Sequence, residues 1–333
     1  MTRRLLLSNY HSIEEAQSVA LYASLGFEVL SLGAYLVPRE PGDPKRPPLD
    51  IDPAPPEVLE ACRDTHAAKQ NLPEVVYEWL GPDGIIVAHH FIPETVFMQW
   101  PRLRKWGGRV IWRSDGQSSP DLERMARSYR SQGLERVAYS PKEQHLANYA
   151  GHDAIIRFGY DPKEYGGWTG HESIAINISQ HLLQRGSATN WGFWEEVTKG
   201  LDRLALGPGS QDIGGPGEIA FDDMKQWLRR ARAFLYTGTV PASYTLGLLE
   251  AAMTGIPVVS IGTAWFGPFG DLFEVPELIP LGGYDDPQIA RQVLVRLLTD
   301  YDFAKSVSER QRKMIVARFG IEQITAEWRE YLA

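Results

Sequence analysis

Cysteine is almost absent from this sequence, because Cys62 is the only one among 333 residues. A single thiol excludes an intramolecular disulfide and any metal site built from several thiolates. It fits a reducing compartment, so we expect a cytoplasmic protein. Long apolar runs are missing as well, and no stretch has the length that crosses a bilayer, so we expect no integral membrane association. The short leucine run at residues 5–7 predicts a first strand rather than a signal peptide.

The sequence also lacks an excess of positive charge, since its formal net charge is −8. General attraction to a phosphate backbone is therefore missing, which disfavours an acceptor recognised mainly by charge, such as bulk DNA. One local basic cluster remains, made of Arg102, Arg104, Lys105, Arg109 and Arg113. A solvated helix face is the commoner origin of such a cluster, so it is only a secondary indication of nucleic-acid binding.

Low-complexity tracts are absent too, and the remaining composition is that of a folded globular protein, with 43% apolar and 23% charged residues. The length exceeds that of one ordinary domain and suits two. Apolar runs typical of buried strands alternate with helical patterns, at residues 84–88, 109–112 and 136–139 and again from 173.

This alternation predicts an α/β fold with doubly wound parallel sheets, whose ligands collect beyond the carboxyl ends of the strands. A segment rich in Gly, Pro and Tyr, residues 160–170, separates the two stretches of alternation. We therefore expect two Rossmann-like domains, residues 1–165 and 166–315, that face a central cleft.

The strongest candidate site is the start of a helix near residue 245. A strand at 233–237 precedes this helix, Ser243 is predicted as its N-cap, and Gly255 with Pro257 ends it. The free N–H groups of a helix start, together with the positive end of the helix dipole, suit a diphosphate. The sequence therefore predicts a phosphate site at this helix start.

Thr245, Leu246 and Gly247 supply the amides of that site, and Gly247 leaves room for a ligand or a neighbouring backbone. Glu250 lies further along the helix, where a carboxylate can accept two hydrogen bonds from a ribose diol. The alternative interpretation is an ordinary apolar stripe facing the core, with Glu250 on the solvent side. The residues alone leave these two interpretations equal.

Residues 244–259 resemble the donor-site segment of the retaining glycosyltransferase family 4, whose members have the GT-B fold. The family pattern has two glutamates separated by seven residues. Glu250 matches the second, which the resemblance assigns to the ribose hydroxyls. The first falls on Ala242, a departure that removes the usual carboxylate contact to the donor sugar.

Three further segments resemble the same family. Residues 179–186 are similar to a Gly-Arg-x-x-x-x-Lys-Gly stretch whose two cations hold the diphosphate; Arg185 keeps the second cation and Gln180 replaces the first. Phe221 lies in the segment that corresponds to the base-contacting loop. Residues 316–333 resemble the C-terminal helix that crosses back to the first domain.

The acceptor side is predicted at the ends of strands in the first half of the chain. His89 and His90 end one strand, Asp115 follows another, and His11 lies in the loop after the first. Any of the first three could orient or deprotonate an acceptor hydroxyl, and His11 is a candidate for contacts near the sugar. The alternative is a structural histidine with a capping aspartate. The family often has a histidine where Asp115 falls.

We expect no metal site, because adjacent histidines at a strand end usually diverge and no third ligand has suitable spacing. The acidic pairs at 222–223 and 285–286 are predicted as helix caps. The resemblance likewise implies no obligatory metal and no cofactor besides the nucleoside-diphosphate sugar that serves as donor.

The resemblance implies transfer of a hexosyl group from a nucleoside-diphosphate sugar, such as a UDP-sugar, to a hydroxyl acceptor with retention of configuration. Two alternatives stay open. One is a phage-type glycosyltransferase that acts on a modified DNA base through the basic cluster. The other is a protein that binds a nucleotide sugar without catalysis, which the changes at Gln180 and Ala242 suggest.

Overall fold

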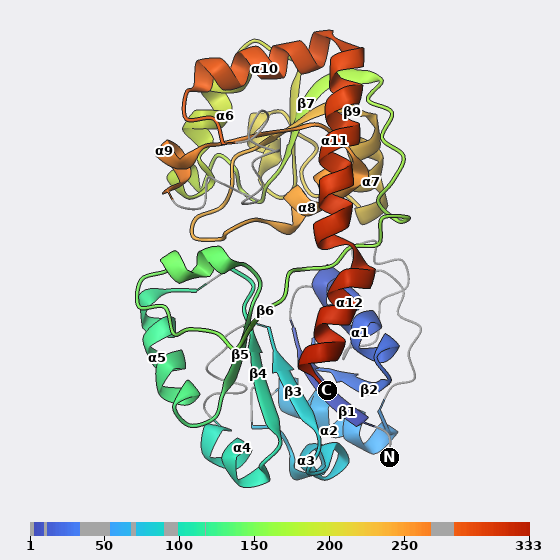
Figure 1. Cartoon of the computed structure of the whole chain (residues 1–333), viewed down its shortest axis with the longest axis vertical. Helices are drawn as coiled ribbons and strands as arrows, with labels where there is room; N and C mark the ends of the chain where they lie inside the picture. Colours follow the sequence, from blue (N-terminus) through green and yellow to red (C-terminus); the bar gives the residue numbers. More distant parts are fainter. Residues whose placement is uncertain are drawn as a thin grey trace. The chain divides into compact units, whose positions relative to one another are not determined.

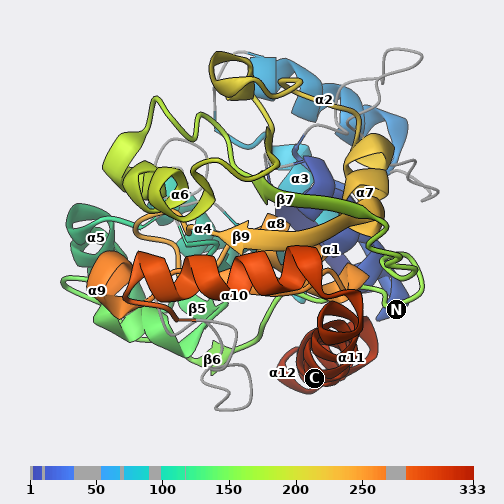
Figure 2. The same ribbon diagram turned by 90° about the horizontal axis from the view of Figure 1, so that it is seen from above.

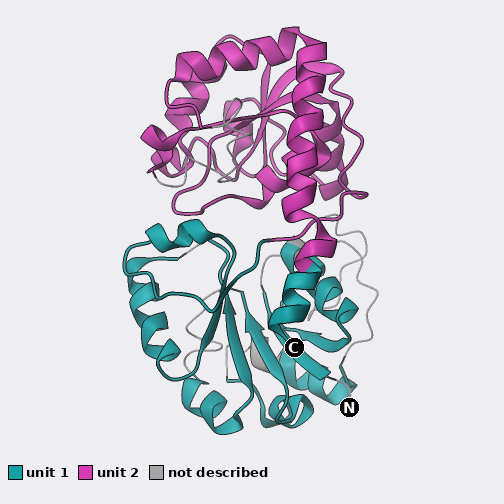
Figure 3. Cartoon of the chain, in the orientation of Figure 1, with its two compact units in different colours: residues 1–157, 325–333 teal, residues 158–324 magenta. Residues whose placement is uncertain are grey.

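The computed structural model describes residues 3–9, 12–33, 54–67, 71–89, 99–116, 118–267 and 283–333. They form two compact units (Figure 3). Unit 1 consists of Met1–Arg157 together with Thr325–Ala333, and unit 2 consists of Phe158–Ile324. The chain thus leaves unit 1 once and returns to it with its last residues.

Unit 1 is built on a six-stranded parallel sheet in the order β2-β1-β3-β4-β5-β6 (Figure 1). Its strands are β1 (Arg3–Ser8), β2 (Phe27–Ser31), β3 (Ile85–Ala88), β4 (Arg109–Arg113), β5 (Glu135–Ala138) and β6 (Ala154–Ile155). Its helices are α1 (Ser12–Ser24), α2 (Pro56–Ala67), α3 (Glu74–Leu80), α4 (Trp100–Trp106), α5 (Pro120–Arg130) and the 3₁₀ helix η2 (Pro141–His145).

Both faces of this sheet are covered, which explains why its central strands read as continuous apolar runs. Every second side chain of these strands, including Leu6, Ile86 and Trp112, lies on the face covered by α2, α3, α4 and α5. The neighbouring position Arg113 faces the opposite side, where its guanidinium lies over the ring of Trp328 in α12 (Ile321–Tyr331). Tyr22 of α1 packs edge-on against the same ring. The sheet is therefore doubly wound, as the sequence predicts.

Unit 2 contains a four-stranded parallel sheet in the order β10-β9-β7-β8. Its strands are β7 (Glu172–Ile178), β8 (Arg203–Leu206), β9 (Ala231–Tyr236) and β10 (Val258–Ser260). Its helices are α6 (Trp191–Thr198), α7 (Phe221–Arg230), α8 (Leu246–Thr254), α9 (Thr263–Phe266), α10 (Pro287–Thr299) and α11 (Tyr301–Phe319), with the 3₁₀ helices η3 (Gly186–Thr189) and η4 (Ser210–Ile213).

Helices cover a face of the unit 2 sheet and one of its edges. Helix α10 packs on β7, β9 and β10, and Figure 2 shows it running along the sheet beside β7 and β9. At the edge strand β10, Gln311 of α11 accepts a hydrogen bond from the Val258 N–H at 2.8 Å and donates one to its carbonyl at 3.0 Å. An amide side chain thus satisfies backbone groups that an edge strand would leave unpaired. Among the described residues, no helix has the length and apolar character that crossing a membrane requires.

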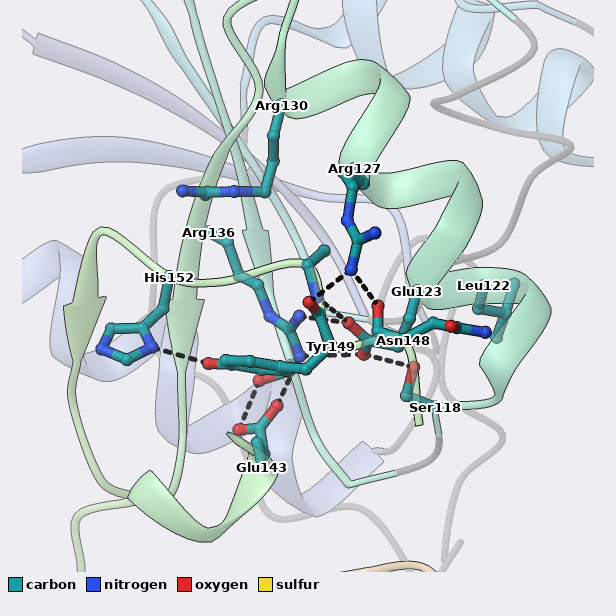
Figure 4. Close-up of polar contacts among 12 residues, drawn as sticks. Ser118, Leu122, Glu123, Arg127, Arg130, Arg136, Glu143, Asn148, Tyr149 and His152 are labelled. Atoms are coloured by element: carbon teal, nitrogen blue, oxygen red, sulfur yellow. Dashed lines mark hydrogen bonds and ion pairs between the residues drawn. The ribbon is translucent and has the colours of Figure 1, made fainter. Parts of the chain in front are cut away.

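A buried charge cluster joins three elements of unit 1 (Figure 4). Arg136 of β5 binds Glu123 of α5 at 2.6 Å and Glu143 of η2 at 2.7 Å, and all three side chains are almost fully buried. The guanidinium also lies between the rings of Trp112 and Tyr149, at 4.1 and 4.5 Å from their centroids. Burial by itself lowers the pKa of Arg136, but Glu143 and Glu123 outweigh burial and raise it above its usual value.

Each of the two carboxylates in this cluster also accepts hydrogen bonds from other groups, so neither depends on Arg136 alone. Glu123 accepts from Ser118 Oγ and from the Ala150 N–H, each at 2.7 Å. Glu143 accepts from Ser114 Oγ at 2.7 Å and from the Tyr139 N–H at 2.8 Å. The cluster therefore ties the ends of β4 and β5 to the elements that follow them.

We predict that Arg136→Met lowers the free energy of unfolding of unit 1 by about 3–5 kcal/mol, because it leaves two buried carboxylates without their cation. Denaturant unfolding of the full chain at pH 7 measures this loss. Arg124→Met is the control, since Arg124 pairs with Asp121 on the exposed surface of α5 and its loss should cost less than about 1 kcal/mol. Equal effects of the two substitutions would contradict this assignment.

Candidate functional site

The start of α8 follows the carboxyl end of β9, but its N-cap is Thr245 and not Ser243. Thr245 has extended backbone angles and its hydroxyl accepts the Leu248 N–H, while Gly255 ends the helix at φ 98°. The N-cap prediction at Ser243 is wrong because the intervening Tyr244 is held in the core, edge-on to Phe158 and Phe319. Tertiary packing thus delays the helix by two residues.

The first N–H groups of α8, those of Leu246 and Gly247, have no acceptor within the helix. N–H groups at the start of a helix attract anions in general. A Cβ at Gly247 would lie 3.3 Å from Cβ of Ile178, so this glycine lets the last residue of β7 pack closely on the helix start. The space beside Gly247 is therefore occupied by Ile178 of the same unit.

Glu250 is buried in unit 2, with 3% of its surface exposed. The interpretation that places it on the solvent side of α8 is therefore wrong. Its Oε1 accepts a hydrogen bond from the hydroxyl of Tyr165 at 3.4 Å. Burial raises the pKa of Glu250 to about 7; the Tyr165 hydrogen bond opposes this rise and the charge of Glu164 adds to it. The carboxyl group is thus poised to change charge near neutral pH.

Tyr165 links Glu250 to Phe221, another predicted donor residue. Phe221 begins α7, and its ring lies edge-on to Tyr165 with 6.4 Å between centroids. Lys225, one turn further along α7, lies 4.5 Å above the ring of Phe221 and 3.3 Å from Glu164. Glu250 and Phe221, two of the predicted donor-site residues, therefore both contact Tyr165. The sequence analysis placed Tyr165 only in the segment between the two domains.

The predicted diphosphate-binding turn follows β7. Gln180 lies two residues beyond Ile178, the last residue of β7, whose side chain lies near Gly247 at the start of α8. His181 adopts a left-handed conformation at φ 54°, and its carbonyl accepts the Arg185 N–H at 2.9 Å. The side chains of Gln180 and Arg185 are exposed to solvent. The turn carries one cation, as its sequence indicates.

Ala242 occupies the position of the first glutamate in the family pattern. It is buried, and its N–H donates to the Thr239 carbonyl at 2.7 Å in the loop that leads to α8. An alanine side chain cannot make the carboxylate contact that the family pattern has at this position.

His89 lies directly after β3 in unit 1 and is buried. Its Nδ1 is 2.6 Å from Oε1 of Glu14, which lies in the first turn of α1. Sequence reasoning missed Glu14, because the only local signal was an acidic first turn of a helix, which ordinarily reflects the helix dipole. The structure thus gives this predicted histidine a carboxylate partner.

Asp115 follows β4, the strand next to β3 in the sheet. It is half-buried, and the preceding Ser114 is anchored by its hydrogen bond to Glu143. His89 and Asp115 therefore follow adjacent strands, although the partner of His89 is Glu14. His90 and His11 lie outside the described residues.

The basic cluster is only partly exposed: Arg102, Arg104 and Lys105 of α4 are exposed, whereas Arg109 and Arg113 of β4 are not. Arg113 is buried, and Arg109 makes two hydrogen bonds of 2.9 Å to Glu135. Arg102 pairs with Glu74, and Arg104 donates to the Gln132 carbonyl. Where the structure describes the chain, no three His, Cys, Asp or Glu side chains are grouped as ligands of a metal ion would be.

Comparison with known proteins identifies the fold. No protein-family model and no curated protein matches the sequence. Solved structures match over nearly the whole chain. HepE of Anabaena, solved with UDP and glucose, is 13% identical with a TM-score of 0.69, and 99% of each chain is covered.

Two other glycosyltransferase structures match similarly. One is a glycosyltransferase from Rickettsia africae, at 13% identity and a TM-score of 0.68, with 99% of this chain and 98% of that chain covered. The other is a UDP-forming α,α-trehalose-phosphate synthase from Burkholderia vietnamiensis, at 12% identity and a TM-score of 0.61, with 100% and 99% covered. The chain therefore has the GT-B fold of these glycosyltransferases, with two Rossmann-like units.

Proposed function

We propose that the protein is a glycosyltransferase that moves a hexosyl group from a nucleoside-diphosphate sugar to a hydroxyl acceptor. The observation that carries this proposal is the arrangement at α8, where a helix start with free amides is followed by the buried Glu250. N–H groups at a helix start bind a diphosphate, and a carboxylate accepts hydrogen bonds from ribose hydroxyls. HepE, which shares the fold, was solved with UDP-glucose, so we take a UDP-sugar as the donor class.

In this proposal the leaving diphosphate lies at the amides of Thr245, Leu246 and Gly247. Arg185 and Gln180, from the exposed turn after β7, complete its surroundings. Positive charge and N–H dipoles aimed at the diphosphate stabilise the negative charge that develops as the sugar leaves. Phe221 contacts the base. Resemblance to family 4 supports retention of configuration, and no metal or cofactor takes part in the proposed reaction.

The ribose would replace or join Tyr165 as a donor to Glu250. Without ligand, the buried carboxyl group accepts one long hydrogen bond of 3.4 Å. A ribose diol offers two hydroxyl donors, and hydrogen bonds to a charged acceptor are about twice as strong as neutral ones. Donor binding would therefore favour the ionised form of Glu250.

Unit 1 would supply the acceptor side, with His89 and Asp115 near the reacting hydroxyl and His90 and His11 as further candidates. Residues 316–333, which comprise the end of α11 and the whole of α12, would link the two domains. The single cysteine supports a location in the cytoplasm. The basic cluster gives a DNA acceptor limited support, because Arg113 is buried and Arg109 is paired with Glu135, which leaves Arg102, Arg104 and Lys105 exposed.

We predict that Glu250→Gln weakens binding of UDP-glucose at least 10-fold, since one strong acceptor for the ribose diol becomes an amide of similar shape. Isothermal titration calorimetry at pH 8 measures this change. Glu196→Gln is the control, because Glu196 is an exposed glutamate of α6 that bonds only Gln288 among the described residues. Unchanged affinity in the Glu250 variant would show that the donor site is assigned wrongly.

Catalytic competence needs a separate measurement because a binding protein without chemistry would pass the calorimetric test. We expect the full chain to release UDP from UDP-glucose in the presence of a hydroxyl acceptor or, more slowly, of water. Tight UDP-glucose binding without any UDP release would instead favour the non-catalytic alternative.

We also predict a pH dependence of stability from Glu250. Its pKa rises from an ordinary 4.5 to about 7 in the folded protein. The stabilisation from its protonated form is therefore complete below pH 4.5 and is lost as the pH rises through 7. Between pH 4.5 and pH 7 the free energy of unfolding of wild type should fall by roughly 3 kcal/mol relative to that of Glu250→Gln, which cannot ionise. Thermal unfolding of both proteins from pH 4.5 to 8 tests this; a constant difference would contradict it.

A further inference from the structure

The pair formed by His89 and Glu14 leaves one polar atom unused. Both side chains are almost fully buried, and Nδ1 of His89 lies 2.6 Å from Oε1 of Glu14. Nε2 of the same ring is buried and has no hydrogen-bond partner among the described residues. Buried polar atoms are nearly always paired, and an exception calls for an explanation such as a catalytic role.

The protonation state of the pair follows from this geometry. The short contact requires a proton between Nδ1 and Oε1. If His89 were an imidazolium, or if Glu14 carried the proton and Nε2 were protonated, a buried N–H would lack an acceptor. An unmade hydrogen bond of this kind costs about 1–3 kcal/mol, and more for a charged group. A neutral ring that donates from Nδ1 leaves only a lone pair at Nε2.

Tyr22 of α1 lies in the same part of unit 1 as this pair, because its hydroxyl feels the charges of both Glu14 and Arg113. A carboxylate that accepts from Nδ1–H holds the ring in one orientation and one tautomer, which is the role of the acid in a histidine-centred catalytic group.

We propose that Glu14 is the positioning residue that holds His89 in its Nδ1–H form, and that Nε2 of His89 is the base for the acceptor hydroxyl. This inference rests on the proposed glycosyltransferase function. The hydroxyl proton moves to Nε2 as the acceptor oxygen forms its bond to the anomeric carbon, on the face from which the diphosphate leaves, as the proposed retention of configuration requires. The bond from that carbon to the diphosphate oxygen breaks, and its electron pair leaves with the diphosphate. The imidazolium then returns its proton to water.

The chain offers a matched control for Glu14. Glu15 is the next residue of α1 and is equally buried, but its Oε1 accepts from the hydroxyl of Ser31 in β2. Glu15→Gln makes the same chemical change one residue away, without touching His89. A loss of function caused only by disturbing α1 should therefore appear in both variants.

The first test reads the tautomer directly and needs no substrate. Long-range ¹H–¹⁵N NMR on the full chain labelled with ¹⁵N-histidine distinguishes the two ring nitrogens, and His89→Asn assigns the signals. We expect a protonated Nδ1 and an unprotonated Nε2 in wild type and in Glu15→Gln. Glu14→Gln should move the proton to Nε2 in a substantial fraction, because the amide can donate to Nδ1. An Nε2–H tautomer in wild type, or no change in Glu14→Gln, would overturn the positioning role.

The second test separates catalysis from binding. With UDP-glucose as the probe and UDP release as the signal, Glu14→Gln should lower kcat about 10²–10⁴-fold, the usual contribution of acid–base catalysis, with little change in the KM for UDP-glucose. Glu14→Asp should recover part of kcat, and Glu15→Gln should retain the wild-type rate. A changed tautomer with an unchanged kcat would overturn the role of Nε2 as base. If wild type neither binds nor cleaves any nucleotide sugar, the proposed function fails, while the NMR result still decides the role of Glu14.

Discussion

Parallel pairing of strands is the constraint on which the rest of this structure depends. Each parallel strand needs a crossover that returns the chain to the same end of the sheet, and the crossovers here are helices on both faces. Apolar side chains therefore fill the strands, and polar chemistry is displaced to their carboxyl ends. His89 and Asp115 follow adjacent strands of unit 1 for this reason. The turn with Gln180 and the start of α8 likewise follow strands of the unit 2 sheet.

The glutamates buried at or near these strand ends have partners of different chemistry. The partner determines whether a glutamate stabilises the fold or can respond to a ligand. Glu123 and Glu143 share the guanidinium of Arg136, which makes them structural. Glu14 contacts a histidine that retains an unused nitrogen. Glu250 accepts a hydrogen bond from the neutral phenol of Tyr165, and burial raises the pKa of Glu250 to about 7. A full counter-charge stabilises the fold, whereas a neutral partner leaves a group that can respond to a ligand.

The sequence predicts the parts of this protein that depend on local patterns. The α/β class and the doubly wound sheet of unit 1 follow from apolar runs between helical patterns, and Gly255 marks the end of α8 correctly. The N-cap at Ser243 failed because the packing of Tyr244 overrides capping preference. Glu14 and Tyr165 were missed as site residues because their partners lie 75 and 85 positions away along the chain, and residue spacing carries no information about such pairs.

A crystal structure of the full chain with UDP is the most direct test that a nucleotide binds at the start of α8. We expect the diphosphate at the N–H groups of Leu246 and Gly247 and the ribose hydroxyls at the carboxylate of Glu250. UDP bound with its diphosphate away from α8, or a structure in which Glu250 keeps Tyr165 as its partner and contacts no ribose, would contradict it.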